Sequence, residues 1–237
     1  MTAMNIYRLL GDGSHLIAMI YLLLWIIKRK SCSGISGKTQ FVHCIVFTLR
    51  YLDLFKYFIS YYNTLIKLIF LTITYATTGL IAIGYNGTYE MEEDNLKLSY
   101  ILIPSFILGM LFTYTYDILE ICWSMSLFLE ALAILPQLIM SHNRGESLGV
   151  IRHYMLMLAF YKTMYCFNWV YRKLCMDYFS LTSVIAGTGQ TLVYYAAVKM
   201  LYSDQVVFYD RDIFLQYKTL LTESSHAQNR RLNQNSG

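Results

Sequence analysis

Ionisable side chains interrupt the apolar stretches of this 237-residue chain at helical spacing. Arg50 and Asp53 lie one helical turn apart, and Glu120 and Glu130 share another apolar stretch. A charge inside a bilayer is costly, so such residues usually face a partner or a water-filled cavity. We therefore expect these side chains to line an internal binding site.

One predicted helix carries a polar stripe whose members follow one another at steps of four, three and four positions: Tyr161, Tyr165, Asn168 and Arg172. This spacing places them on one face of the helix, with Lys162 and Trp169 beside it. On the first apolar stretch, Arg8 and His15 share a face in the same way. Among these residues, only histidine has an unperturbed titration between pH 5 and 8.

The predicted lining contains more cations than anions, namely Arg8, Arg50, Lys162 and Arg172 against Asp53, Glu120 and Glu130. An anionic ligand with one positive end would complement such a cavity. Hydrogen bonds between charged groups and cation–π contacts are the interactions that this lining offers.

Several of these residues also have ordinary structural interpretations. Trp169 and Arg172 lie near the end of a stretch and could be interfacial anchors. Arg50 and Asp53 could neutralise each other, since charges within a membrane commonly pair. His15 could be a hydrogen-bonded packing residue. Both interpretations of each residue stay open at this point.

The elements that must position these side chains are membrane helices. The chain is 56% hydrophobic and only 14% charged, with a mean hydropathy of +0.41, which is typical of a polytopic membrane protein. Seven apolar stretches each have about the 17–25 residues that a spanning helix needs: 9–27, 41–57, 64–84, 98–114, 118–140, 153–172 and 178–202. Lys67, isolated on the third stretch, is expected to snorkel or pack.

The basic residues indicate an orientation. Lys28, Arg29 and Lys30 crowd the first connection, and Arg144 and Arg152 flank the fifth. The positive-inside rule places these connections and the C-terminus in the cytosol, and the N-terminus on the other side. Because the basic residues do not form one soluble patch, no nucleic-acid partner is expected.

The chain divides into a seven-helix domain, residues 1–202, and a cytosolic tail, residues 203–237. The tail begins with apolar residues at helical spacing, which favours a surface amphipathic helix, and ends in a polar segment without expected structure. Pro136, near the end of the fifth stretch, and the Gly-rich segment 34–40 hold comparable places. We therefore expect an all-α fold with two parallel three-helix repeats joined by a linker helix.

Five strings together resemble the KDEL receptors, also called ER lumen protein-retaining receptors: residues 8–16 (RLLGDGSHL), 32–38 (CSGISGK), 50–55 (RYLDLF), 130–138 (EALAILPQL) and 167–169 (FNW). The resemblance extends over about residues 5–195. It implies a seven-helix fold similar to the PQ-loop and SWEET transporters. It also implies residence in endoplasmic reticulum and Golgi membranes, with the N-terminus in the lumen.

The resemblance implies a receptor for the C-terminal Lys-Asp-Glu-Leu signal of escaped luminal proteins, which binds in the acidic Golgi and releases at neutral pH. The terminal carboxylate would meet Arg50 and Tyr51, and the acidic side chains would meet Arg8 and Arg172. The peptide's lysine would lie against Trp169, near Glu120 and Asp53, and Tyr165 belongs to the same lining. Coat proteins would be partners on the cytosolic face, and membrane lipid surrounds the helices.

The family analogy assigns the pH switch to His15, Tyr161, Glu130 and the position of Lys162. Protonation would give His15 a second donor and a charge, which lets it compete for Glu130 or Tyr161. This chain departs from the family in two places. Lys162 stands where the family has Arg, and Ala196 stands where the family has an acidic residue linked to retrograde movement. The tail also lacks a terminal lysine sorting signal.

The rival hypothesis is a small-solute transporter on the same parallel-repeat fold, which predicts alternating access instead of sorting. The cationic lining favours the receptor, because a neutral solute would not require so many buried charges. An enzyme is not expected, since the sequence shows no nucleophile–base pair. Neither a cofactor nor a metal site is expected.

Overall fold

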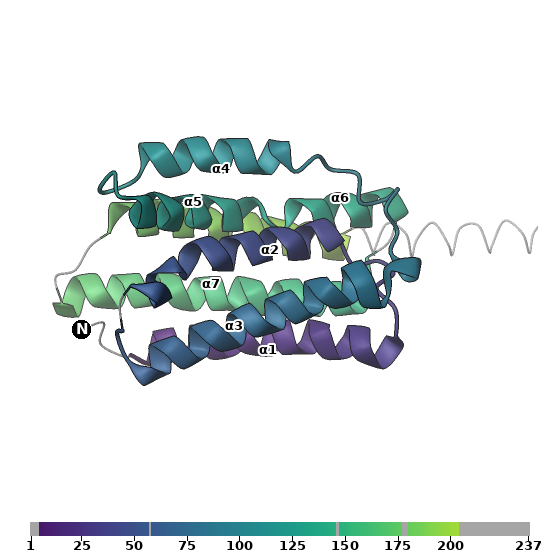
Figure 1. Cartoon of the computed structure of the whole chain (residues 1–237), viewed down its shortest axis with the longest axis horizontal. Coiled ribbons are helices and arrows are strands. Elements are labelled where there is room, and N and C mark those ends of the chain that lie inside the picture. Colours follow the sequence, from purple (N-terminus) through teal and green to yellow (C-terminus); the bar gives the residue numbers. More distant parts are fainter. Residues whose placement is uncertain (1–4, 57, 146, 177–179, 204–237) are drawn as a thin grey trace, which may run out of the picture.

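The computed structural model describes residues 5–56, 58–145, 147–176 and 180–203. All regular structure in these ranges is helical: α1 (Ile6–Arg29), α2 (Gly37–Arg50), η1 (Leu52–Phe55), α3 (Tyr61–Gly79), η2 (Leu80–Gly84), η3 (Asn86–Thr88), α4 (Ser99–Leu111), α5 (Ile118–Leu132), α6 (Leu135–Arg144) and α7 (Gly149–Met176). A last helical segment covers residues 181–203. The helices lie side by side in an elongated bundle (Figure 1).

The outer surface of the bundle is apolar. Large side chains such as Ile17 on α1, Phe106 on α4 and Leu192 on the last segment are more than half exposed. Within the described residues, the helical stretches Ile6–Arg29, Tyr61–Gly84 and Ile118–Arg144 are long and apolar enough to cross a bilayer. The prediction of an all-α polytopic membrane protein is confirmed.

The second apolar stretch differs from its prediction. Helix α2 begins at Gly37 because the Ser36 side chain accepts a hydrogen bond from the Thr39 amide and caps the helix. It ends at Arg50, since Tyr51 leaves the helical conformation (φ −108°, ψ 17°) and the short 3₁₀ helix η1 follows. Residues 41–57 are therefore not one continuous helix, and Arg50 and Asp53 do not share a helical face.

The fifth apolar stretch is divided at its proline. Helix α5 ends at Leu132, and α6 begins at Leu135 with Pro136 in its first turn, where a missing N–H group is tolerated. The next side chain, Gln137, accepts a hydrogen bond from the Ser36 amide at 2.8 Å and donates one to the Gly34 carbonyl at 2.9 Å. These hydrogen bonds hold the start of α6 against the connection that precedes α2.

Two helix pairs form the centre of the bundle. Helix α1 packs along α7, and α2 packs along α5, while α4 covers α5 from outside (Figure 1). If the unit α1–α3 corresponds in order to the unit formed by α5/α6, α7 and residues 181–203, then α1 corresponds to α5/α6 and α2 corresponds to α7. The contact of α1 with α7 is then equivalent to the contact of α5 with α2. This relation agrees with the two predicted repeats, although the repeat itself stays a prediction.

Carboxylates tie the connections together at the end of the bundle where α6 ends. Asp94 accepts hydrogen bonds from the hydroxyls of Ser36 at 2.8 Å and Tyr89 at 2.6 Å, while Glu90 pairs with Arg144. Partial burial alone would raise the pKa of Glu90, but hydrogen bonds from Arg144 and Ser33 outweigh it and lower that pKa below its usual value. The predicted tail helix, within residues 203–237, lies outside the described residues apart from Ser203, which ends the last segment.

Candidate functional site

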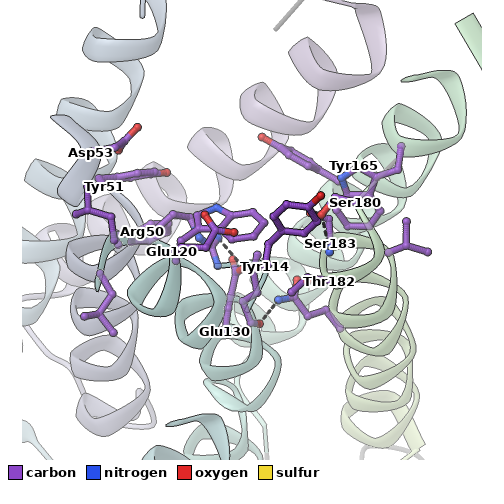
Figure 2. A pocket seen from close by; sticks show the side chains of 18 of the residues that line it. Arg50, Tyr51, Asp53, Tyr114, Glu120, Glu130, Tyr165, Ser180, Thr182 and Ser183 are labelled. Carbon is purple, nitrogen blue, oxygen red and sulfur yellow. Dashed lines mark hydrogen bonds and ion pairs between the residues drawn. The ribbon is translucent and has the colours of Figure 1, made fainter. Parts of the chain in front are cut away.

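All twelve predicted site residues line one cavity of about 1400 Å³. They are Arg8, His15, Arg50, Tyr51, Asp53, Glu120, Glu130, Tyr161, Lys162, Tyr165, Trp169 and Arg172. They come from α1, α2, η1, α5 and α7, together with the turn at Tyr51. Figure 2 shows Asp53 and Tyr51 at the upper edge of the cavity, with Arg50 below them and Glu130 lower still.

Glu130 is the centre of a buried charge cluster. Its side chain is 2% exposed, and its Oε2 atom accepts from both Arg50 Nη1 and Lys162 Nζ at 2.8 Å. The Tyr161 hydroxyl donates to the other carboxylate oxygen, Oε1. A carboxylate so deeply buried requires such partners, because losing one leaves charge uncompensated. We call Arg50, Glu130, Tyr161 and Lys162 the floor cluster.

The two cations of the floor cluster are also held by neutral groups. Arg50 donates through Nε to the Ser126 hydroxyl at 3.2 Å and through Nη2 to the Ser126 carbonyl at 3.0 Å. Lys162 donates to Gln190 Oε1 at 2.6 Å. Lys162 therefore meets Glu130 through one oxygen only, as expected of a point charge in place of a planar guanidinium.

His15 packs flat against the floor cluster. Its ring is stacked on Tyr161, with 4.1 Å between ring centres and 2° between the ring planes. Phe70 and Phe47 enclose it at 4.9 and 5.5 Å. A proton on this ring would place a positive charge on the face of the tyrosine that holds Glu130, where a cation is attracted.

Two expectations about ion pairs, one for Lys67 and one for Arg50 with Asp53, differ from the structure. Asp53 pairs with Lys67, whose Nζ lies 2.5 Å from Asp53 Oδ2 and 5.5 Å from the centre of the Tyr51 ring. The expectation that Lys67 is isolated is wrong, because the turn after Arg50 brings Asp53 to α3. The alternative that Arg50 and Asp53 neutralise each other is wrong for the same reason, since Arg50 pairs with Glu130.

A second carboxylate at the mouth, Asp12, was missed as a site residue. It is buried and accepts hydrogen bonds from the Tyr165 hydroxyl and, at 3.1 Å, from that of Tyr62. Arg8 lies 3.7 Å away and also donates to Asn63 at 3.4 Å. The spacing of Arg8 and Asp12, one helical turn, was the signal that could have identified this pair.

Trp169 packs against the last helical segment, not solely at a lipid interface. A Cβ atom added at Gly187 would lie 1.7 Å from the Trp169 ring, so the glycine provides the space for the indole. The Tyr165 ring meets the same indole in an edge-to-face arrangement, with 6.3 Å between the ring centres. Glu120 and Arg172 line the same cavity.

The remaining contributors had weak sequence signals. Gln190 is a lone amide within an apolar stretch, and it lies buried beside Lys162. The Ser126 carbonyl accepts from Arg50 because α2 packs on α5. A contact between two helices that are distant in sequence cannot be read from a local sequence pattern.

Comparisons with known proteins show the family of the chain. Residues 31–172 match the family model described as ER lumen protein retaining receptor. The chain is 44% identical to ER lumen protein-retaining receptor 3 of Mus musculus over 191 residues, which cover 81% of this chain and 89% of the relative. Receptor 2 of Gallus gallus is 45% identical and receptor 2 of Homo sapiens is 44% identical, each over 81% of this chain and 90% of the relative. The chain therefore belongs to the ER lumen protein-retaining receptor family.

Proposed function

We propose that this chain binds the C-terminal Lys-Asp-Glu-Leu-type signal of escaped luminal proteins at acidic pH and releases it at neutral pH. It works as a receptor and not as an enzyme, in endoplasmic reticulum and Golgi membranes. Basic residues in the first and fifth connections support a luminal N-terminus and a cytosolic C-terminus, where coat proteins would engage the tail.

One observation carries the proposal. At the floor of an open cavity, Arg50 already holds a carboxylate, that of Glu130, at 2.8 Å. Guanidinium groups bind carboxylates by charge-assisted hydrogen bonds, and a ligand carboxylate can take the place of the internal one. The terminal carboxylate of a peptide entering this cavity is a group of the required charge and shape.

The distribution of charge above the floor suits the rest of the peptide. A four-residue extended segment reaches about 13 Å, enough to extend from Arg50 toward the mouth. Arg8 and Arg172 line the cavity where the acidic side chains would lie, and Trp169 and Glu120 line it where the lysine would lie. Tyr51 and Tyr165 supply hydroxyls in the same lining.

The switch follows from competition for Glu130. In the described arrangement, Glu130 occupies Arg50, which opposes binding of a ligand carboxylate. Protonated His15 on the face of Tyr161 adds a positive charge that attracts Glu130 through the tyrosine it binds. Protonation would therefore loosen Glu130 from Arg50 and leave the guanidinium for the peptide.

The test compares two peptides that differ only at the C-terminus. Purified full-length protein is titrated with a Lys-Asp-Glu-Leu peptide carrying a free carboxylate and with its C-terminally amidated form. We expect the free acid to bind at about pH 5.5–6 and weakly at about pH 7.4, and the amide to bind at neither. Equal affinity for the amide, or tighter binding at neutral pH, would overturn the proposal.

A further inference from the structure

A second, much smaller cavity shares His15 and Phe47 with the main one. About 10 Å³ is open to water there, which is roughly the room that one molecule needs. Besides His15 of α1, its polar lining comes from α2, α3 and α7: Gln40, His43, Thr74, Thr77 and Tyr154. A buried water is held by two to four polar partners, and this lining supplies more than that number.

Among the residues that line this cavity, His43 has a buried side-chain nitrogen without a hydrogen-bond partner in the described structure. Its side chain is buried, and Nδ1 makes no hydrogen bond of normal geometry among the described residues, although the Thr39 carbonyl lies beside the ring. An unsatisfied nitrogen in the interior is costly, and ordered water is a common partner for such groups. The hydroxyls of Thr74 and Thr77 donate to carbonyls of their own helix, which leaves their oxygens able to accept from water.

His15 and His43 both pack against the ring of one phenylalanine, Phe47. Their ring centres are 5.5 and 6.4 Å from that of Phe47. Ionisable groups act on the pair from three helices: Arg50 from α2, Glu130 from α5, and Lys162, Tyr154 and Tyr161 from α7. The part of α3 that lines the small cavity contributes hydroxyls only, those of Thr74 and Thr77.

We propose that the small cavity binds one water molecule linking His15 to His43, with neutral His43 as the acceptor at the end of the chain. Protonated His15 then donates to the water, and the water donates to His43. A second proton on His43 would place a like charge beside the first, so the pair favours one proton over two. His43 is thus a positioning residue that stabilises the acid form of His15, and the inference rests on the proposed function.

The test measures the pH midpoint of Lys-Asp-Glu-Leu peptide binding to full-length protein. His43→Phe removes the acceptor, so we expect the midpoint to move about one pH unit lower, the equivalent of one hydrogen bond to a charged group. Thr74→Val removes one partner of the water with little change of shape and should move the midpoint the same way by less. His43→Gln keeps an acceptor and should return the midpoint close to that of the unsubstituted protein.

Each outcome decides between the two claims. An unchanged midpoint in both His43→Phe and Thr74→Val, or a midpoint moved to higher pH, overturns the water link while acid-dependent binding still supports the receptor. Absence of peptide binding by the unsubstituted protein refutes the proposed function instead. If His43→Phe does not fold, Thr74→Val and titration of the His15 ring by nitrogen NMR in that variant decide, with a lower His15 midpoint expected and an unchanged one contradictory.

Discussion

Arg50 is the residue on which peptide binding should depend most. Its guanidinium is placed by Ser126 and Glu130, and a lysine could not reproduce all three hydrogen bonds. We expect Arg50→Ala to abolish measurable peptide binding at about pH 5.5, a loss of at least roughly a hundredfold. Arg50→Lys, which keeps the charge, should lose roughly tenfold or more, which separates charge from geometry. Calorimetric titration of the purified variants measures both.

Arg29→Ala is the matched control for these substitutions. Arg29 is exposed at the C-terminal end of α1, where its guanidinium lies 5.9 Å from the centre of the Trp25 ring. It should keep the affinity of the unsubstituted protein. A folded Arg50→Ala variant with undiminished affinity would contradict the carboxylate assignment.

Lys162 stands where the resemblance implies an arginine, and its contacts give a second prediction at the residue scale. Lysine holds Glu130 through one oxygen, whereas arginine could hold it through two. Lys162→Arg should therefore hold Glu130 more firmly and move the midpoint of peptide binding to lower pH, because more proton-linked free energy is needed. Lys199→Arg, at an exposed position, should leave the midpoint unchanged.

Other results of the same titration are also informative. An altered maximal affinity with the original midpoint would assign Lys162 to the ligand. No change in either quantity would exclude Lys162 from the mechanism.

At the residue scale, helical spacing and charge predicted which side chains gather, but not which of them pair. The twelve predicted residues line one cavity because charges in apolar helices must turn inward. Pairing depends on neighbours from other helices: Asp53 meets Lys67 and Arg50 meets Glu130. Whether the twelve bind the peptide stays a prediction.

At the scale of elements, the last helical segment should set the position of Trp169. Gly187→Ala would place a methyl group within the volume of the indole, so we expect the ring to shift and peptide affinity to fall about tenfold or more. Gly189→Ala is the matched control, because no atom lies within 4 Å of its added Cβ. That variant should bind normally and be slightly more stable, by up to about 1 kcal/mol, since alanine favours helix. Equal affinities of the two variants would refute this role of Gly187.

The loop carboxylate Glu90 gives a prediction about stability. Its lowered pKa means that the stabilisation is present at neutral pH and is lost as pH falls through the folded-state pKa, which lies below the usual value of a glutamate. Glu90→Gln should lower the melting temperature slightly at about pH 7, by the equivalent of less than about 1 kcal/mol. The difference should shrink in strong acid and stay constant between about pH 5.5 and 7.4.

The exposed neighbour provides the control for that measurement. Glu92→Gln removes the same charge from a solvated side chain and should leave the melting temperature unchanged. A destabilisation by Glu90→Gln that is larger at acidic than at neutral pH would contradict the assignment.

The bounds of elements were harder to predict than their existence. Apolar runs predicted each helical stretch, but a run of apolar residues does not reveal where a cap or a proline divides it. Ser36 starts α2 earlier than hydropathy indicates, and Pro136 separates α6 from α5. These local signals are polar or steric, so they are invisible to hydropathy.

At the scale of the whole molecule, composition and apolar run lengths were sufficient to predict an all-α membrane protein. The parallel repeat is supported by the equivalent pairings of α1 with α7 and α2 with α5. Orientation rests on Lys and Arg in the connections, because a bundle by itself has no cytosolic side. The tail, residues 203–237, and its engagement by coat proteins stay predictions.

The central claim is that peptide binding and protonation are one coupled event around His15 and the floor cluster. Coupling requires that binding take up protons in the range where affinity changes with pH. The direct measurement is calorimetric titration of the full-length protein with a Lys-Asp-Glu-Leu peptide near pH 6.5–7, repeated in buffers of different ionisation enthalpy. We predict uptake of about one proton for each peptide bound. Binding of full affinity with no proton uptake would contradict the account.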